Sequence, residues 1–265
     1  MEEVIRSTAN SRVKLVKKLL TDSKHRKSEG LWVAEGVRLV EEVLASGLPI
    51  SFLVVSEDAD SDRIERIKLE VSRKQVELIA VSRGVMKELS DTAAPQGVAA
   101  VFSPPEFTLE ELAKSRRPVL ILDAVRDPGN LGTIARSALA GGAGGIILGP
   151  SSVDPGNPKA LRGSMGALLR LPVVSVDTNS GVREALSMPI LGTGGEGGKL
   201  PEECPLHEPF ALLIGQEAEG ISEEWRALAD SWLTIPMENG VESLNVATAA
   251  SVILFEAARQ RRSRS

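Results

Sequence analysis

Short apolar runs alternate with helical patterns through the second half of the chain. Such nearly continuous runs are typical of strands that are buried on both faces of a parallel sheet. They occupy residues 119–125, 144–149, 171–176, 189–192, 210–215 and 232–236. Helical patterns follow most of these runs, and the last one is at about 244–260. The alternation predicts an α/β domain with a mostly parallel sheet and helices on both faces.

The first third of the chain predicts a smaller α/β domain. Helical patterns at 12–20 and 37–45 alternate with extended patterns at 31–34, 52–55 and 97–102. Residues 103–118 carry prolines at both ends and charged residues between them, which is typical of a linker. We therefore expect a first domain at 1–103, a linker at 104–118 and a second domain at 119–265.

The amino-acid composition limits the kinds of site and the cellular location that we expect for the chain. The chain of 265 residues is 42% hydrophobic and 25% charged, which is ordinary for a globular protein. Cys204 is the single cysteine, and His25 and His207 lie far apart in the sequence, so we expect neither a disulfide nor a metal site. The amino terminus has acids where a signal peptide needs bases, and the apolar run near the carboxyl terminus stops at Glu256. We therefore expect a cytoplasmic protein with no membrane partner.

The amino-terminal residues carry a local excess of positive charge. Residues 1–30 contain eight Lys or Arg against four acids, although the net charge of the chain is -5. This distribution favours a local basic patch over a global positive field as a means of binding nucleic acid. Tyr is absent and aromatic residues make up 3% of the chain, which disfavours stacking on bases. Any RNA is expected to be bound through its phosphates and its shape.

The glycine-rich segment 192–197 matches the G-x-G-x-x-G spacing of dinucleotide-binding proteins but lacks their context. In those proteins a helix begins at the glycines and directs its amino terminus at the pyrophosphate. Here the chain continues with more glycine and two prolines, which disfavours a nicotinamide-dependent oxidoreductase. A loop whose bare backbone approaches a ligand fits the segment better.

Three further stretches place polar side chains beside predicted strand ends and helix starts. The stretches are DPGNLGTIARSA (127–138), LLIGQEAEGIS (212–222) and IPMENGVESLNVATAASVILFEAARQ (235–260). Their candidate side chains are Asn130, Arg136, Glu217, Ser243 and Asn245. Each has a structural alternative: the Asn and Ser side chains suit helix caps, Glu217 suits a solvated loop, and the Ala-rich helix suits a close-packed core or a dimer. Arg136 lies off the apolar face of its helix, so it faces solvent or a site.

Taken in order, the three stretches resemble the three motifs of the SpoU/TrmH family of RNA ribose 2'-O-methyltransferases, within the SPOUT superfamily. The segment NPKALRGSMGALLRLPV at 157–173 resembles the part of that family between the first two motifs. The first domain resembles the family's substrate-binding domain, which has an L30e-like fold, at residues 7–42 and at PQGVAAV, 95–101.

The resemblance implies features that periodicity does not predict. It implies a deep trefoil knot, although knots are nearly absent from proteins, and this knot forms the site for the cofactor S-adenosylmethionine. By motif match the cofactor contacts Thr193, Gly194, Gly215, Ile235, Met237 and Leu244. The resemblance also implies a homodimer through the second domain. The small residues suited to close packing in the knot or across that interface are Ala247, Ala249, Ala250 and Ser251.

The resemblance places Asn130, Arg136, Glu217, Ser243 and Asn245 at the family's catalytic positions, for methyl transfer without a metal. A guanidinium keeps its proton near neutral pH and is a poor base. We therefore favour Arg136 as a clamp on the target phosphate that orients the 2'-hydroxyl, with deprotonation through a phosphate-coupled arginine left open. Asn130 and Ser243 would orient the ribose or Arg136. Asn245 would hold the cofactor loop, and Glu217 would order its own loop or accept the proton.

The appended first domain favours ribosomal RNA of the large subunit as the substrate, with transfer RNA as an alternative. A non-catalytic RNA-binding or ribosome-assembly protein on the same scaffold is a second alternative, and the complete set of catalytic positions counts against it. The expected RNA contacts are Arg12, Lys14, Lys17, Lys18, Arg26 and Arg162.

Overall fold

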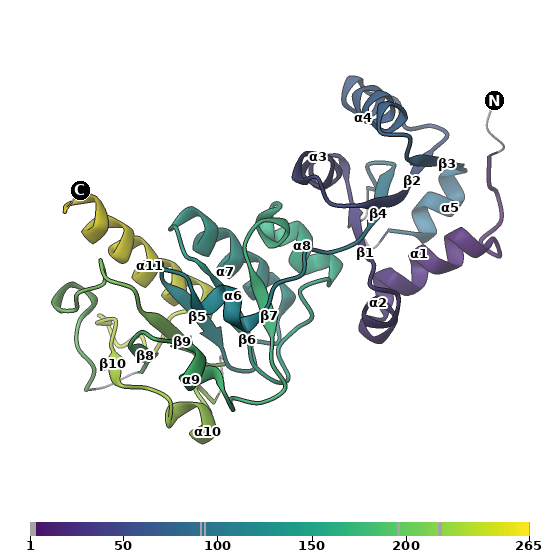
Figure 1. Ribbon diagram of the computed structural model, residues 1–265. Helices are drawn as coiled ribbons and strands as arrows, with labels where there is room; N and C mark the ends of the chain where they lie inside the picture. The colour runs from purple at the N-terminus through teal and green to yellow at the C-terminus, as the bar shows by residue number, and fades with distance from the viewer. Residues whose placement is uncertain (1–3, 91, 93, 195–196, 217–218, 265) are drawn as a thin grey trace. The chain divides into compact units, whose positions relative to one another are not determined.

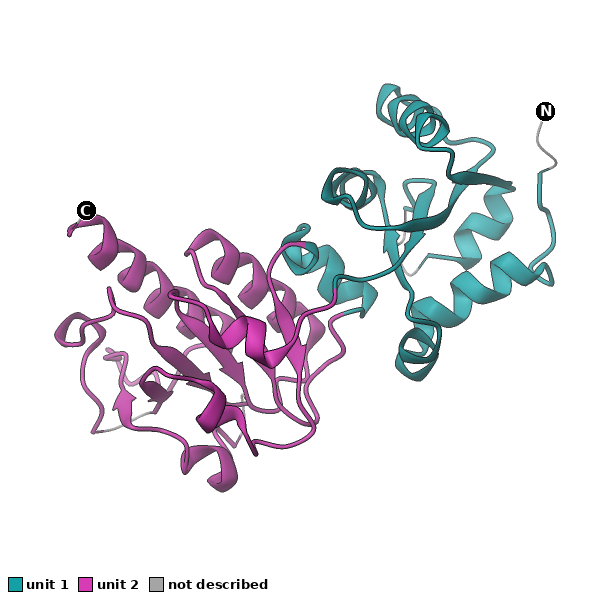
Figure 2. Ribbon diagram, viewed as in Figure 1, with its two compact units in different colours: residues 1–105, 156–169 teal, residues 106–155, 170–265 magenta. Residues whose placement is uncertain are grey.

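The computed structural model describes residues 4–90, 92, 94–194, 197–216 and 219–264, and Figure 1 labels its helices and strands. The chain forms two compact units, which Figure 2 colours separately. The first comprises residues 1–105 and 156–169, and the second comprises residues 106–155 and 170–265. Within the part of the chain that is described, no helix is long and apolar enough to cross a membrane.

A mixed four-stranded sheet forms the centre of the first unit. Its strands are β1 (Trp32–Glu35), β2 (Ile50–Ser56), β3 (Glu77–Val81) and β4 (Val98–Phe102), in the order β1-β4-β2-β3. β2 and β3 are parallel, whereas β4 is antiparallel to both β1 and β2. The helices before and between the strands are α1 (Ser11–Thr21), α2 (Ser23–Glu29), α3 (Val37–Ser46), α4 (Asp62–Arg73) and α5 (Arg83–Glu88). The predicted small α/β domain is confirmed.

The basic helix α1 packs its apolar face against the core of this unit. Val13, Val16 and Leu19 recur at helical spacing and are almost completely buried in one cluster with Phe52. Asn10 begins the helix, because its side chain accepts a hydrogen bond of 2.9 Å from the second helical N–H. The helix therefore keeps its lysines on the exposed side.

Residues 156–169 group with the first unit, although their place in the sequence predicted the second domain. They form α8 (Pro158–Ser164) and the short 3-10 helix η1 (Ala167–Leu169). The segment approaches β1 closely, because a Cβ on Gly156 would lie 2.5 Å from Nε1 of Trp32. Such a pairing between distant segments leaves no trace in a local pattern. The other division, between residues 105 and 106, falls within the predicted linker, which contains α6 (Leu109–Ala113).

The second unit is built on a six-stranded sheet in which every pair of neighbours is parallel. The strands are β5 (Val119–Leu122), β6 (Gly145–Leu148), β7 (Val173–Ser175), β8 (Ile190–Thr193), β9 (Ala211–Ile214) and β10 (Ser231–Leu233). The remaining helices are α7 (Pro128–Ala140), α9 (Val182–Ala185), η2 (Pro201–Glu203), α10 (Glu223–Arg226) and α11 (Val246–Arg262). The predicted mostly parallel sheet is confirmed.

Both faces of this sheet are covered. Val119 and Ile121 of β5 belong to one apolar cluster with residues of α6, α9 and α10. Leu120 and Leu122 alternate with them, are also fully buried, and face the opposite side, which α7 and α11 cover (Figure 1). This double burial explains why the strands are almost continuously apolar.

α7 and α11 pack side by side and run in the same direction. Ser251 donates a hydrogen bond of 2.7 Å to Ser137. One turn further along both helices, a Cβ on Gly141 would lie 3.3 Å from Cβ of Leu254, so the two backbones approach closely there. The knot that the family resemblance implies stays a prediction.

The strand order decides which loops meet. The order is β10-β8-β9-β5-β6-β7, so β10, β8, β9 and β5 are consecutive neighbours. Because these strands are parallel, their carboxyl ends lie at the same edge of the sheet. The segments that follow them are therefore neighbours, although they are far apart in the sequence.

Candidate active site

A cavity of about 290 Å³ lies at the carboxyl edge of the six-stranded sheet. Its walls come from the segments after β8, β9 and β10 and from the segment that leads into α11. All six residues predicted to contact the cofactor line it: Thr193, Gly194, Gly215, Ile235, Met237 and Leu244. The structure brings these six together at one place, and their role as cofactor contacts stays a prediction.

The cavity combines bare backbone with apolar side chains. Gly194 and Gly215 present their main chains, whereas Ile235, Met237 and Ile253 supply apolar surface. Small-molecule sites commonly pair apolar walls with a few fixed polar groups. A flat heterocycle with hydrogen-bonding edges fits such walls, so the residues present suit the adenosine part of S-adenosylmethionine.

The loop after β9 closes tightly. Gln216 and Gly220 exchange two backbone hydrogen bonds of 3.1 Å. A Cβ on Gly215 would lie 2.1 Å from the carbonyl carbon of Gly220, so the position accepts only glycine. Glu217, which is a predicted catalytic residue, lies outside the described residues.

A buried acid at the end of β5 holds the far side of this loop. Asp123 is 5% exposed, and its carboxylate accepts a hydrogen bond of 2.7 Å from the backbone N–H of Ser222. Its own N–H donates to the carbonyl oxygen of Ile214 at 2.8 Å. Asp123 thus fixes both the start of the loop and the residue that precedes α10. The sequence motifs did not mark Asp123 as a site residue, and the one local signal was an acid placed directly after an apolar strand.

Asn130 and Asn245 meet across 115 positions of sequence: Nδ2 of Asn245 donates to Oδ1 of Asn130 at 3.0 Å. Asp127, and not Asn130, caps α7, because its side chain accepts from the N–H of Asn130. Asn245 does cap α11, with its Oδ1 accepting from the N–H groups of Ala247 and Thr248. The amide of Asn245 therefore has two uses, since one end holds its own helix and the other holds the motif-one asparagine.

Ser243 and Arg136 are placed differently. Ser243 lines the cavity. Arg136 is exposed on α7, the helix that begins beside Asn130, and is not among the residues that line the cavity. No hydrogen bond or ion pair joins the side chain of Arg136 to any residue that the structure describes. Its guanidinium is therefore open to an external anion.

Two of the arginines predicted to contact RNA are engaged within the first unit. Arg26 is 4% exposed and donates a hydrogen bond of 2.6 Å to the carbonyl oxygen of Leu19, so it ties α2 to α1. Arg12 forms an ion pair of 2.8 Å with Glu77 and places its guanidinium carbon 4.7 Å from the ring centre of Phe52. These contacts give both arginines a structural use.

The lysines of α1 divide into two kinds. Lys17 forms an exposed ion pair of 3.2 Å with Glu88. Lys14 and Lys18 are exposed and have no hydrogen bond or ion pair through their side chains with any described residue. Of the predicted RNA contacts on α1, these two offer the least engaged charge.

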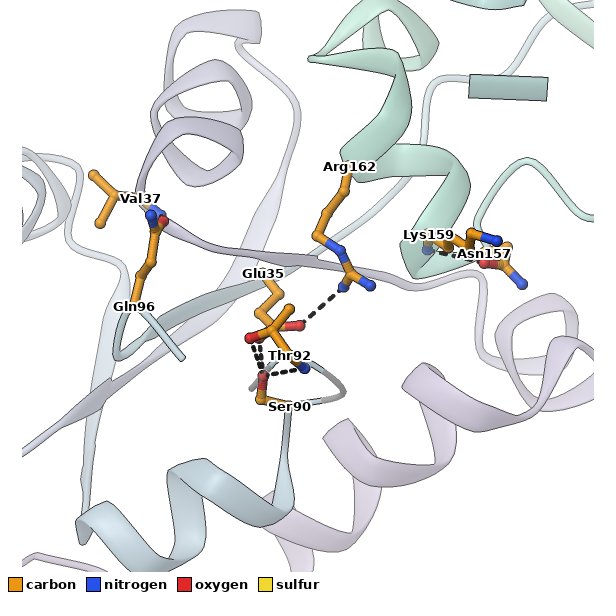
Figure 3. Close-up of polar contacts among 8 residues, drawn as sticks. All are labelled: Glu35, Val37, Ser90, Thr92, Gln96, Asn157, Lys159 and Arg162. Carbon is orange, nitrogen blue, oxygen red and sulfur yellow. Dashed lines mark hydrogen bonds and ion pairs between the residues drawn. The ribbon is translucent and has the colours of Figure 1, made fainter. Parts of the chain in front are cut away.

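Arg162 of α8 is held by a buried acid (Figure 3). Glu35 is 6% exposed, and its carboxylate accepts a hydrogen bond of 3.0 Å from Nη1 of Arg162 and further bonds from the hydroxyls of Ser90 and Thr92. A buried carboxylate requires such partners, because its desolvation is otherwise unfavourable. Arg162 therefore holds α8 in place. Glu35 was missed, because 127 positions separate it from its partner.

In the part of the chain that is described, no group of three or more His, Cys, Asp or Glu side chains is placed to hold a metal ion. The cavity instead offers backbone groups, apolar surface, the hydroxyls of Thr193 and Ser243, and the charged side chains of Arg226 and Glu242. The site can therefore bind and orient small molecules through hydrogen bonds and burial.

Residues 117–255 match the SpoU rRNA Methylase family, and residues 10–100 match the MRM3-like substrate binding domain. The chain belongs to the SpoU rRNA methylase family. This SpoU chain is 35% identical to the 23S rRNA (guanosine(2553)-2'-O)-methyltransferase RlmP of Bacillus subtilis, over 95% of the chain and 97% of the relative. It is 32% identical to the mitochondrial rRNA methyltransferase 3 of Homo sapiens, over 91% of the chain and 70% of the relative.

Solved structures agree over almost the whole SpoU chain. The crystal structure of the SpoU methyltransferase AviRb from Streptomyces viridochromogenes, in complex with the cofactor AdoMet, has a TM-score of 0.86 at 33% identity. That match covers 96% of this chain and 99% of the other. An AdoMet-bound rRNA methyltransferase from Sinorhizobium meliloti has a TM-score of 0.86 at 30% identity, with 97% of each chain covered. The predicted family, α/β fold class and enzyme class, an RNA 2'-O-ribose methyltransferase, are confirmed.

Proposed function

We propose that the protein transfers a methyl group from S-adenosylmethionine to a ribose 2'-hydroxyl of 23S ribosomal RNA. The observation that carries this proposal is the cavity at the carboxyl edge of the sheet in the second unit, where residues of the second and third motif segments and of the glycine-rich segment after β8 converge. Relatives named for 23S rRNA 2'-O-methylation match nearly the whole chain, from its first domain to its last helix. The proposal includes a cytoplasmic location, where bacterial ribosomal RNA is found.

The cavity residues hold the methyl donor in this proposal. The main chains of Gly194 and Gly215 approach its adenosine, and Ile235, Met237 and Leu244 cover its apolar surface. When bound, S-adenosylmethionine supplies an electrophilic methyl group on a sulfonium. Fixing that group beside one hydroxyl removes much of the entropic barrier to transfer.

Arg136 binds the phosphate next to the target ribose. Its side chain is exposed and has no partner among the described residues, so no internal contact must break before it binds RNA. A guanidinium forms two parallel hydrogen bonds with a phosphate, which fixes the orientation of the attached sugar. A guanidinium keeps its proton near neutral pH, which disfavours it as the base. Arg136 therefore acts by positioning the 2'-hydroxyl.

The other motif residues complete the arrangement. Asn130 and Asn245 are joined at 3.0 Å, so the amino-terminal ends of α7 and α11 hold each other in register beside the cavity. Ser243, which lines the cavity, orients the ribose. Glu217 orders its loop or accepts the hydroxyl proton.

The first unit binds the RNA outside the reacting nucleotide. Lys14 and Lys18 on α1 supply unpaired positive charge, and Lys17 and Arg12 add charge that is shared with acids. Arg26 and Arg162 contribute by shaping this surface, because Leu19 and Glu35 hold their guanidinium groups. Binding through phosphates agrees with the small aromatic content of the chain.

The second unit forms a homodimer in this proposal. Val252 and Phe255 of α11 are large apolar side chains that are 42% and 48% exposed, and they lie one turn apart on the same face. Exposed apolar pairs of this kind favour a protein partner.

The small residues of α11 serve a different contact. Ala247 and Ala250 are buried and Ser251 bonds to Ser137, so these small residues serve the contact between α7 and α11. The exposed pair of Val252 and Phe255 tests the dimer: Phe255→Asp should convert a dimer to a monomer in sedimentation experiments.

Nucleoside mass spectrometry tests the function directly. The purified chain is incubated with S-adenosylmethionine and either 23S ribosomal RNA or bulk transfer RNA, both from a strain that lacks the gene. The expected result is one new 2'-O-methylated nucleoside in 23S RNA only. Methylation of transfer RNA alone would show that transfer RNA, and not 23S RNA, is the substrate. Binding of 23S RNA without any methylation would support the non-catalytic alternative.

A further inference from the structure

Trp232 of β10 forms part of the wall next to the cavity because two glycines of the neighbouring strand leave room for its ring. A Cβ on Gly192 would lie 2.7 Å from Cζ3 of Trp232, and a Cβ on Gly194 would lie 3.2 Å from Cε3. Gly194 itself lines the cavity. The indole therefore packs closely against the end of β8, beside Gly194.

Arg226 lies on this indole. Its guanidinium carbon is 4.6 Å from the ring centre of Trp232, which is the geometry of a cation–π contact. Arg226 is the last residue of α10, and Asp123 holds Ser222, the residue before that helix, through the 2.7 Å hydrogen bond. The Trp232 ring thus positions the guanidinium without the use of its hydrogen-bond donors, and Asp123 anchors the start of the helix that carries it.

Those donors have no acceptor in the described part of the chain. No carboxylate or carbonyl among the described residues bonds to the side chain of Arg226, which is exposed and lines the cavity. Among the described residues that line the cavity, Arg226 is the only cation, and Glu242 is the only anion. A cation that is held in place but left without an anion indicates a site for an anionic group of the ligand.

We propose that Arg226 binds the α-carboxylate of the methyl donor and makes the site selective for a donor that carries an intact amino-acid moiety. The inference rests on the proposed function, since S-adenosylmethionine has a single carboxylate, at the end opposite its adenine. The Trp232 ring fixes the guanidinium, so little side-chain freedom is lost when the two hydrogen bonds to the carboxylate form. Arg226 is a binding residue for the cofactor and takes no part in moving the proton.

Calorimetric titration of the purified full chain with two donors tests this proposal. The probes are S-adenosylmethionine and its decarboxylated analogue, which keeps the adenosine, the sulfonium and the amine. The variants are Arg226→Met, which keeps the apolar stem, and Arg226→Lys. Arg116→Met, at an exposed arginine before β5 in the same unit, is the matched control. Near-ultraviolet circular dichroism verifies that the tryptophans keep their environment in each variant.

The wild-type chain should bind S-adenosylmethionine about tenfold or more tightly than the decarboxylated analogue, as expected for a charge-assisted pair. Arg226→Met should lose this preference by weakening only the binding of S-adenosylmethionine. Arg226→Lys should keep part of the preference, because it keeps the charge but loses the planar fork. The control should behave as the wild type does.

Three outcomes would overturn the inference. If Arg226→Met weakened the binding of both donors equally, Arg226 would act by supporting Trp232 or by contacting the adenine. Unchanged donor binding with weaker RNA binding would assign it to an RNA phosphate. Unchanged binding of both donors and RNA would leave it no role. In all three, wild-type methyl transfer persists, whereas failure of the proposed function itself would appear as a wild-type chain that binds neither donor.

Discussion

Two arginines of the second unit differ in their contacts from most arginines of the first unit. In the first unit, arginines are mostly engaged by nearby acids or carbonyl groups: Arg6 pairs with Glu57 at 2.9 Å, and hydrogen bonds from Arg63 lower the pKa of Glu41. In the second unit, Arg183 and Arg259 also pair with acids, whereas the side chains of Arg136 and Arg226 have no such partner among the described residues. The difference suggests a rule: a run of basic residues indicates a charged surface, whereas an arginine without an internal partner near the motif residues indicates a ligand site.

The largest effect that tests this contrast is expected at Arg136. Arg136→Ala should lower the rate of methyl transfer at saturating RNA and cofactor by about 10³-fold, because one charged group that positions the substrate is removed. Arg136→Lys should remain far below the wild type, since an ammonium cannot form the planar double contact. Single-turnover kinetics measure the rate, with Arg116→Ala as the control. A normal rate in Arg136→Ala would refute both the clamp and the base.

The next effect concerns the backbone of the cavity. Gly215→Ala should weaken cofactor binding by about 100-fold or prevent folding of the second unit, because its Cβ would lie 2.1 Å from a carbonyl carbon of the backbone. Gly84→Ala in α5 is the control, because the nearest atom to its Cβ would be 3.9 Å away. Calorimetry and thermal unfolding of both variants measure the two effects. Wild-type affinity in Gly215→Ala would show that the loop does not form the cofactor site.

Two substitutions of Asn245 distinguish its role as the cap of α11 from its hydrogen bond to Asn130. Asn245→Ala removes both, so it should lower stability by about 1 kcal/mol and also lower the rate of transfer. Asn245→Asp keeps the oxygen that caps α11 and removes the donor to Asn130, so it should keep the stability while the rate falls about tenfold. Denaturant unfolding and initial rates measure the pair. Equal rates for Asn245→Asp and the wild type would leave Asn245 as a cap only.

A smaller effect is expected on α1, where paired and unpaired lysines lie on one helix. The double substitution Lys14→Ala and Lys18→Ala should weaken RNA binding several-fold and reduce the slope of log affinity against log salt by about two. Lys17→Ala should change both less, because Glu88 already shares its charge. Filter binding over a range of salt concentrations measures the slopes. If Lys17→Ala had the larger effect, the presence or absence of an internal ion pair would not predict which lysines contact RNA.

The smallest effect is a pH dependence in α11. Hydrogen bonds from Arg259 and then Gln260 lower the pKa of Glu256 from its ordinary 4.5 to about 2. A carboxyl group with a lowered folded-state pKa stabilises the fold fully above its unfolded pKa, and this stabilisation is lost as the pH falls through the folded pKa. Glu256→Gln should therefore unfold more easily than the wild type at pH 7, with the difference shrinking between about pH 4.5 and pH 2. Urea titrations at three pH values detect the trend, and a constant difference would contradict it.

Local patterns predicted the elements of the second unit well, since each buried strand and amphipathic helix carries its own signal. The six cofactor positions, taken from the motifs, line one cavity because β8, β9 and β10 are neighbours in the sheet. Periodicity has no information about that strand order. The motif resemblance supplied the positions, and the structure supplied the reason why they meet.

Contacts between distant segments were the part that could not be predicted. Glu35 and Arg162 pair across 127 positions, and neither residue type nor spacing marks them as partners. The same pairing explains why residues 156–169 belong to the first compact unit. Asp123 was missed for a similar reason, because its partner Ser222 comes from a different strand and loop.

The contact between Asn130 and Asn245 also bears on how the protein is made. α7 is synthesised early in the second unit, whereas α11 follows every strand of the sheet. A nascent chain can form the sheet before the ribosome has released α11, yet it lacks the residues that close the cavity from Ser243 onwards. Contacts of such long sequence separation form late. Cofactor binding should therefore appear only once α11 has left the ribosome, so occupancy by S-adenosylmethionine would distinguish nascent chains that expose α11 from shorter ones.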